Sequence, residues 1–521
     1  MWRRLIVLRG VFIAALLLIS GCASLPEHVA RDESSAFQDT NTTRLGLKSA
    51  AMQQAHPGES GFLPLQSGVD AMLARLVLAE TAERSLDVQY YIWHADLTGR
   101  HFAHALLRAA DRGVRVRILL DDLGVNPNDE TLLSLDAHAN IEIRLFNPVA
   151  SRSLRNLSAL TDFSRVNRRM HNKAFVADNQ AAILGGRNIG DEYFGASGEV
   201  AFGDLDVLTM GAGVSDVSAA FDRYWNSPQS IPVAALLERS GDLASLAALR
   251  AQLNAFIDTQ RDSPYVTEAK ARFAEKLAPI DKGFYWGKAH LLYDDPAKIT
   301  HATDVTEGRL LPQFANLGMK IQSELLIVSP YFVPGDKGVE WLRSLVARGV
   351  RVTVLTNSLA ATDVGAVHAG YQRYREALLA GGVRLYEFKP TATAEEHAKR
   401  EKKTGGGSRA SLHAKTFVFD RRAIFIGSLN LDPRSIQLNT EIGVVCESAT
   451  MAGEIAGKLE RNLDRIAWRL ERTVDEAGNA RIAWLETDAD GVHQRLQEPE
   501  VSAWRRFSVW FLGMLPIEEQ L

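Results

Sequence analysis

Apolar and polar residues alternate in short runs along the chain, and stretches of helical length separate these runs. Residues 85–93 and the Val-rich run 112–120 are two such strand-like segments with a helical stretch between them. Residues 324–332 and 348–356 repeat this arrangement later in the chain. A strand, a helix and a second strand form a βαβ unit. The pattern therefore predicts an α/β fold with a parallel or mixed sheet covered by helices.

This pattern indicates an internal duplication. The pentapeptide Arg-Gly-Val-Arg-Val begins at Arg112 and again at Arg348, 236 residues later. The strand ends at 141–148 and 383–390 also correspond. Solenoid repeats are much shorter, so a repeat of this length indicates two copies of one domain. We expect a first half at residues 67–260, a connecting segment at 261–285 and a second half at 286–470.

The first residues have the layout of an export signal. Three arginines precede an apolar run at residues 10–19, which is too short to span a bilayer of ~30 Å as a helix. The following segment, Ile19-Ser-Gly-Cys22, resembles a bacterial lipobox. We interpret residues 1–21 as a lipoprotein signal peptide, Cys22 as the lipidation site and the polar residues 22–66 as a tether; a plain signal peptide is the alternative. This predicts a bacterial lipoprotein anchored in the outer or inner membrane and facing the periplasm.

The last segment, residues 471–521, is predicted to be a tail with an aromatic helix. Residues 504–515 combine Trp, Phe and Leu with two arginines. Such a helix suits a membrane interface, where Trp and Arg are favoured. A terminal helix packed on the body of the protein is an equal alternative.

The most informative pattern is His-x-Lys-x₄-Asp, which occurs at residues 171–178 and again at 413–420. Each copy continues through a second apolar run to a glycine turn and an asparagine. Side chains two apart in a strand share a face, and the returning strand brings the asparagine level with the histidine. The candidate residues are His171, Lys173, Asp178 and Asn188 in the first half, and His413, Lys415, Asp420 and Asn430 in the second.

These residue types suit a phosphodiester. Lysine attracts phosphate oxygens, and asparagine adds neutral N–H donors. Histidine attacks phosphorus or transfers a proton near neutral pH. Two histidines from two halves would flank one phosphodiester, so that one attacks and the other protonates the leaving alcohol. The histidines occur with lysines rather than with carboxylates, so we expect neither a metal nor another cofactor.

Carboxylates should orient the two imidazoles, as in a catalytic triad. We assign Glu441 to His413 and Asp206 to His171, with Asp204 as the competitor of Asp206. The motif aspartates, Asp178 and Asp420, belong to the catalytic motifs. They fall where a turn is expected, and we interpret them as structural supports.

Composition narrows the class of protein. The 521 residues are 46% hydrophobic and 23% charged, which excludes a polytopic membrane protein and a wholly disordered chain. The net charge of −4 excludes a global basic field for nucleic acid. The two cysteines are too few for a disulfide framework or a thiolate metal cluster.

The paired motifs resemble those of the phospholipase D superfamily. Residues 87–93, 161–171 and 185–194 look like its bacterial cardiolipin synthase C branch, and 293–298 and 515–518 fit it as well. The resemblance implies an α/β sandwich in each half, with the active site at the pseudo-twofold interface.

The resemblance also implies roles for individual residues: His171 attacks and His413 is the acid. Gly186 stands where the second motif, and the family generally, has serine, as in Ser428, which we expect to bind substrate.

The expected activity is a phosphatidyltransferase that makes cardiolipin through a covalent phosphohistidine. Its partners would be the membrane and phospholipids, namely phosphatidylglycerol and, as donor, phosphatidylglycerol or phosphatidylethanolamine; nucleic acid is not expected. The sequence leaves an accessory protein open. It also leaves open a phospholipase D-type hydrolase, a nuclease or other phosphodiesterase, and a lipid-binding scaffold with a decayed site.

Overall fold

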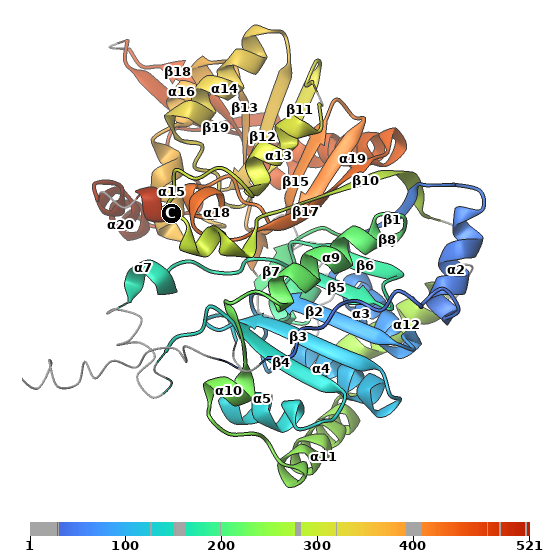
Figure 1. The fold of residues 1–521 in the computed structure, drawn as a ribbon. Helices are drawn as coiled ribbons and strands as arrows, with labels where there is room; N and C mark the ends of the chain where they lie inside the picture. Colours follow the sequence, from blue (N-terminus) through green and yellow to red (C-terminus); the bar gives the residue numbers. More distant parts are fainter. Residues whose placement is uncertain are drawn as a thin grey trace, which may run out of the picture.

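A computed structural model describes most of the chain. The described residues are 29, 31–125, 128–150, 152, 162–197, 200–276, 283–318, 320–391, 409–476, 478–488, 491–515 and 518–521. The predicted signal peptide and Cys22 lie outside them. In Figure 1 the first half, coloured blue to green, lies below the second half, coloured yellow to red.

The first half is built on a mixed sheet. Its parallel strands are β2 (Ser85–Tyr90), β3 (Arg115–Asp121) and β4 (Ile141–Phe146). β2 also pairs with β5 (Ala174–Ala177), and antiparallel pairing continues through β6 (Ala181–Gly185), β8 (Asp206–Gly211) and β1 (Ser60–Leu65). The short β9 (Ser230–Pro232) closes the β4 edge.

Helices cover both faces of this sheet. One face carries α3 (Gly68–Thr81), α4 (Leu97–Asp111) and α5 (Asp129–Asp136), with α10 (Val233–Leu236), α11 (Leu243–Gln260) and α12 (Pro264–Lys276) outside them. The other face carries α9 (Val214–Trp225). Strand alternation explains this: in β5, Phe175 and Ala177 pack in one core cluster, whereas Ala174 and Val176 pack in another.

The second half repeats the sheet. β11 (Glu324–Val328), β12 (Arg351–Asn357) and β13 (Arg384–Phe388) are parallel. Antiparallel pairing leads from β11 through β15 (Lys415–Phe419), β16 (Ala423–Gly427) and β17 (Ile442–Glu447) to β10 (Tyr285–Tyr293). Its helices are α13 (Leu310–Asn316), α14 (Gly335–Ala347), α15 (Gly365–Gln372), α16 (Arg375–Ala380), α18 (Pro433–Gln437) and α19 (Ala449–Ile466). The predicted duplicated α/β fold is confirmed.

The two halves are joined by backbone pairing and by a shared core. β1 pairs antiparallel with β10, and β7 (Val200–Gly203) pairs parallel with β14 (Arg409–Leu412). One core cluster contains side chains of both sheets, including Val176, Val207, Ile426 and Val444. The halves therefore meet across an apolar interface, and strand ends from both halves lie at this interface.

Two segments that the sequence predicted as tether and connection contain regular structure. Much of the predicted tether is folded, because α2 (Arg44–Gln53) and β1 fall within residues 22–66 and the backbone N–H of Ala36 donates to Asp222 Oδ2 at 2.9 Å. The predicted connecting segment 261–285 contains α12, which packs on α3. Residues 22–66 bury apolar side chains such as Leu45 and Phe62, whereas none of the described side chains of α12 is fully buried.

The predicted tail begins inside a strand. β18 (Ala467–Val474), β19 (Ala480–Asp488) and β20 (Gly491–Arg495) form an antiparallel extension at the β13 edge. The aromatic helix is α20 (Ala503–Gly513), which lies beside α15 in Figure 1. Val509 is buried with Leu359 and Ala369, whereas Trp504 is 74% exposed and Trp510 is 57% exposed. Among the residues with described positions, no helix combines the length and the apolar character needed to cross a bilayer.

Candidate active site

The two motifs lie at the interface between the halves. His171 and Lys173 stand just before β5, and His413 and Lys415 occupy the corresponding positions at β15. All four side chains are buried. The backbone N–H of His171 donates to the Thr440 carbonyl at 2.9 Å, and the backbone N–H of His413 donates to the Gly203 carbonyl at 2.8 Å. Each motif is therefore anchored to the opposite half.

This anchoring brings each histidine to a carboxylate of the other half. His171 Nδ1 lies 2.9 Å from Glu441 Oε2, and His413 Nδ1 lies 2.6 Å from Asp204 Oδ2. The predicted pairs, Glu441 with His413 and Asp206 with His171, are wrong. Each carboxylate directly follows the residue whose carbonyl accepts the backbone N–H of its histidine. Backbone pairing between the halves therefore determines that each histidine meets a carboxylate of the opposite half.

Strand register explains why Asp204, and not Asp206, is the partner. Gly185 of β6 pairs with Asp206, whereas the equivalent Gly427 of β16 pairs with Gly443. Asp206 thus corresponds to Gly443, and Asp204 corresponds to Glu441. Asp206 is buried against Arg75, whose Nη2 lies 2.9 Å from Asp206 Oδ2. It holds α3 to the sheet and takes no part in orienting a histidine.

The two lysines are fixed by their own motifs. Lys173 Nζ donates to the His171 carbonyl at 2.6 Å, and Lys415 Nζ donates to the His413 carbonyl at 2.5 Å. Burial lowers the pKa of Lys173 well below its usual value and that of Lys415 to about 8, although nearby carboxylates oppose the shift. An ammonium donates three hydrogens, so each lysine keeps donors for phosphate oxygens.

Aromatic rings line both histidines, a feature that the sequence analysis did not identify. The Tyr91 ring lies 5.2 Å from the His171 ring. Tyr193 and Phe202 lie 5.2 and 5.1 Å from the His413 ring. Tyr91 lies within the predicted strand-like run 85–93 and directly follows β2, and that run was the one available signal for its position. These rings restrict the imidazole orientations and reduce access of water.

Both motif asparagines are buried. Asn188 Oδ1 accepts the backbone N–H of Ile92 at 3.2 Å, and the Asn188 side chain also hydrogen-bonds to Tyr193, whose ring lies 5.2 Å from the His413 ring. Asn430 Oδ1 is buried and has no partner among the described groups. An unpaired buried polar atom is costly, and a bound ligand would offset that cost.

Ser428 contacts the orienting carboxylate. Its hydroxyl donates to Glu441 and accepts the Ile442 N–H at 3.0 Å. In the structure the Ser428 hydroxyl holds Glu441, and its binding of substrate stays a prediction. In the other half, a Cβ at Gly186 would lie 2.3 Å from Asp204 Oδ1, which explains the glycine at that position.

The motif aspartates hold turns, as their position in the sequence indicated. Asp178 accepts the N–H groups of Glu83, Arg84 and Ser85 just before β2. Asp420 accepts the corresponding N–H groups of residues 322–324 before β11. Within the described part of the chain, neither carboxylate forms a hydrogen bond or an ion pair with a histidine or lysine of the site.

The electrostatic surroundings of the two histidines differ. Burial lowers the pKa of His171 well below 6.5, and the nearby Lys173, Lys415 and His413 lower it further. Burial and then Lys415 also lower the pKa of His413, but Asp204 opposes this shift. Burial raises the pKa of Glu441 to about 7. Burial would also raise the pKa of Asp204, but the attraction of His413 and its hydrogen bond bring it to about 2.

The arginines that precede His171 are used internally. Arg169 is buried, with Nη2 2.8 Å from Asp121 Oδ1. Arg165 Nη1 donates to Asn147 Oδ1 at 2.7 Å, and Arg168 Nη1 donates to the His301 carbonyl at 2.5 Å. Arg169 therefore supports the strand that leads into the site.

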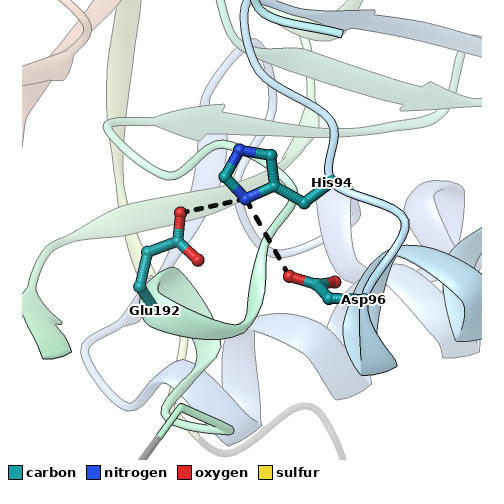
Figure 2. A group of neighbouring side chains, drawn as sticks. All are labelled: His94, Asp96 and Glu192. Atoms are coloured by element: carbon teal, nitrogen blue, oxygen red, sulfur yellow. Dashed lines mark ion pairs between the residues drawn. The ribbon is translucent and has the colours of Figure 1, made fainter. Parts of the chain in front are cut away.

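One group outside the motifs has the composition of a metal site. His94, Asp96 and Glu192 form the single such cluster among the positions that the structure describes, and Figure 2 shows them converging on His94 Nδ1. His94 Nδ1 lies 3.3 Å from Glu192 and 4.0 Å from Asp96, and the hydrogen bond to Glu192 raises the pKa of His94. Asp96 Oδ1 also caps α4 by accepting the Gly99 N–H. Ion pairing and capping account for this geometry.

Comparisons with known proteins agree with this architecture. A family profile described as "Cardiolipin synthase, PLD-like domain" matches residues 76–225 and 319–467. Cardiolipin synthase C of Escherichia coli (strain K12) is 45% identical over 89% of this chain and 96% of its own length. An uncharacterized protein of Helicobacter pylori (strain ATCC 700392 / 26695) is 32% identical over 98% of this chain and 99% of its own length.

A solved structure shows the same fold. The crystal structure of phosphatidylserine synthase from Haemophilus influenzae Rd KW20 matches with a TM-score of 0.54 and 14% identity. The match covers 91% of this chain and 100% of that one. Identity this low is informative about the fold alone.

Proposed function

This chain belongs to the cardiolipin synthase family of phospholipase D-like proteins and is an enzyme of the phosphatidyltransferase kind, and we propose that it makes cardiolipin. The phosphatidyl group comes from one phospholipid and passes to a hydroxyl of phosphatidylglycerol. The observation that carries this proposal is the paired site, in which two imidazoles, each held at Nδ1 by a carboxylate of the opposite half, stand with two lysines.

In the first step His171 Nε2 attacks the phosphorus of the donor. A P–N bond forms, the P–O bond to the headgroup alcohol breaks, and His413 gives its Nε2 proton to the leaving oxygen. Glu441 and Asp204 accept hydrogen bonds from the two Nδ1 atoms, which directs both Nε2 atoms to the chemistry. Lys173, Lys415 and the asparagine amides bind the phosphoryl oxygens.

In the second step His413, now neutral, takes the proton of the acceptor hydroxyl. The resulting oxygen attacks phosphorus, the P–N bond breaks and His171 is regenerated. The acceptor hydroxyl belongs to phosphatidylglycerol, so the product is cardiolipin. If water took this place the product would be phosphatidic acid. The buried site with its aromatic lining favours transfer, because it restricts water.

The assignment of the two histidines rests on their surroundings. A nucleophile must be a neutral imidazole, and burial together with two lysines favours the neutral form of His171. An acid must carry a proton, and Asp204, ionised because its pKa is about 2, favours the protonated form of His413. Environments that differ in this way assign acid and nucleophile roles.

The enzyme acts at a membrane. We propose that residues 1–21 are a lipoprotein signal, that Cys22 is lipidated and that the mature protein faces the periplasm, held by the outer or the inner membrane. The exposed aromatic face of α20 suits the same interface. Several acyl chains on one cysteine would anchor the protein firmly. Phospholipids are the substrates, nucleic acid is not, and an accessory protein is compatible with the fold.

The experiment supplies purified full-length protein with labelled phosphatidylglycerol in vesicles, with and without phosphatidylethanolamine, and identifies the products by mass. A diphosphatidyl product supports the transferase. A higher yield with phosphatidylethanolamine, accompanied by release of ethanolamine, identifies the donor. Phosphatidic acid as the sole product would contradict the transferase and support the hydrolase.

His171→Ala and His413→Ala provide the controls, and each should abolish turnover of the natural lipid. Single-stranded DNA in the same assay tests the nuclease activity, which we expect to be absent. A chelator should leave activity intact, because the proposed steps use side chains alone.

A further inference from the structure

The two halves differ in the helix that precedes the first parallel strand of each sheet. In the first half β1 pairs with β8 and leads into α3; in the second half β10 pairs with β17 and leads into α13. The two helices therefore correspond, but α3 has 14 residues and α13 has seven. α3 packs against α4, α8 (Asp191–Phe194) and β5.

The buried ion pair that holds α3 is missing from the second half. Arg75 of α3 donates to Asp206 at 2.9 Å, and its guanidinium lies 5.2 Å from the centre of the Phe194 ring. The position equivalent to Asp206 is Gly443, where a Cβ would lie 2.3 Å from the Phe425 ring. A long helix in the second half therefore has no carboxylate to hold it in this position.

A large apolar hollow, here called the α13–α14 hollow, occupies the corresponding place. Its volume is about 1510 Å³. Its walls come from α14, α18 and β15, the counterparts of the three elements that α3 covers, together with α13 and β11. The side chains that define it are Leu311, Phe314, Trp341, Leu345, Phe417 and Leu431.

Two chain segments carry both catalytic residues and walls of the α13–α14 hollow. Leu431 directly follows Asn430. Phe417 lies two positions after Lys415 on the same face of β15, a separation of ~7 Å at the rise of a strand. A phosphate bound by Lys415 would thus have apolar walls within reach of groups attached to it.

We propose that the α13–α14 hollow binds acyl chains of the phospholipid substrate. The inference rests on the proposed function and adds the site of the chains to it. The volume exceeds the ~300–1,000 Å³ typical of small-molecule pockets, which suits a ligand of two long chains. Burial of acyl-chain methylenes against leucine, phenylalanine and tryptophan side chains stabilises the bound lipid. The margin carries Lys320, Lys337 and Arg348 against Asp336 and Glu518, and Glu518 is paired with Arg373, so an excess of positive charge faces an anionic lipid.

The first test compares dioleoyl and dihexanoyl phosphatidylglycerol, which share a headgroup. Ala315→Trp adds bulk at an exposed wall position of α13. We expect it to lower kcat/KM for the dioleoyl lipid by about tenfold, while kcat/KM for the dihexanoyl lipid stays unchanged. Leu47→Trp, at a 62% exposed position on α2 in the other half, is the matched control and should change neither. An equal loss for both lipids, or no loss for either, would overturn the proposal.

A second test does not depend on activity or on Ala315→Trp. Phosphatidylglycerol with brominated acyl chains is added to His171→Ala protein, and tryptophan fluorescence is followed. Trp341 is 49% exposed and lines the hollow, so we expect quenching that Trp341→Phe reduces. Equal quenching in both proteins would refute the hollow as the chain site. A wild-type protein that makes no diphosphatidyl product but shows Trp341-dependent quenching would contradict the proposed function alone.

Discussion

His171 Nδ1 lies 2.9 Å from Oε2 of Glu441, a residue of the opposite half and 270 positions away in the chain. The reciprocal contact joins His413 to Asp204 at 2.6 Å. Each half thus supplies one histidine and the carboxylate that orients the other histidine. A single half would carry an imidazole without its orienting carboxylate. The complete site therefore requires both halves.

Replacing either orienting carboxylate should reduce turnover without unfolding the protein. Glu441→Gln and Asp204→Asn keep the shape of the side chain but destabilise the required imidazole tautomer. We expect kcat to fall by about 10³–10⁴, as in triads that lose their carboxylate. Steady-state assays with the natural lipid give kcat, and circular dichroism checks the fold. Wild-type kcat in either variant would refute the assigned pair.

A substrate with a good leaving group should separate the two histidines. Phosphatidyl-p-nitrophenol needs no proton on its leaving oxygen, so His413→Ala and Asp204→Asn should retain near wild-type release of p-nitrophenol in the first turnover. His171→Ala and Glu441→Gln should lose it. Stopped-flow absorbance measures the burst, and mass spectrometry of the quenched protein locates the phosphoryl adduct. The reverse pattern would exchange the roles of His171 and His413.

The pH profile of the first step should be bell-shaped. Burial raises the pKa of Glu441 to about 7, so the carboxylate gains a proton as the pH falls through about 7 and orients His171 less well. Burial lowers the pKa of Lys415 to about 8, so the ammonium loses its charge as the pH rises through about 8. The burst rate with phosphatidyl-p-nitrophenol, measured against pH, checks this. A wild-type burst rate that does not fall on the acid side of about pH 7 would contradict the assignment of that limb to Glu441.

The motif aspartates should affect stability more than chemistry. Asp178→Ala leaves three N–H groups without an acceptor, that of Ser85 buried and those of Glu83 and Arg84 partly buried, and should lower the free energy of unfolding by about 3 kcal/mol. Asp420→Ala should lower it less, because the Asp420 turn is more exposed. Urea denaturation measures both. Activity per folded molecule should stay within about threefold of wild type; a hundredfold loss in fully folded protein would assign these residues to the chemistry.

The Arg75–Asp206 pair should also be structural. Asp206→Leu leaves a buried guanidinium unpaired and should cost about 3–5 kcal/mol, whereas Arg75→Leu together with Asp206→Leu should recover much of that loss. Thermal unfolding of the two single variants and the double variant measures the coupling. If Asp206 oriented a histidine, the double variant would regain stability but remain inactive.

Membrane attachment should have two components. Cys22→Ser should move the protein from the membrane fraction toward the soluble fraction. The remaining association should depend on α20, so adding Trp504→Ser and Trp510→Ser should reduce binding to anionic vesicles further, because both indoles are exposed. Vesicle sedimentation measures both steps. Leu47→Ser, which removes an exposed apolar side chain far from α20 in the chain, is the control and should change neither.

The sequence was sufficient where the information is local. Strand runs, the duplication and the two His-x-Lys-x₄-Asp motifs are periodic or repeated, and they placed His171, Lys173, His413 and Lys415 correctly in one site. The turn position of Asp178 and Asp420 likewise predicted their support of the backbone. The helices and the strand in segments 22–66 and 261–285 were missed, because the polar composition of these segments resembles that of a linker.

The α/β duplication, the catalytic residue types and the family follow from the sequence alone. The folded structure is needed to show which carboxylate meets which histidine, that Ser428 supports Glu441, and that α13 leaves a hollow where α3 fills the first half. These relationships depend on strand register and on pairing between the halves. Asp204 and Asp206 lie two positions apart on the same face of an extended segment, so the hydrophobic pattern does not distinguish them, and it contains no information about contacts across the interface.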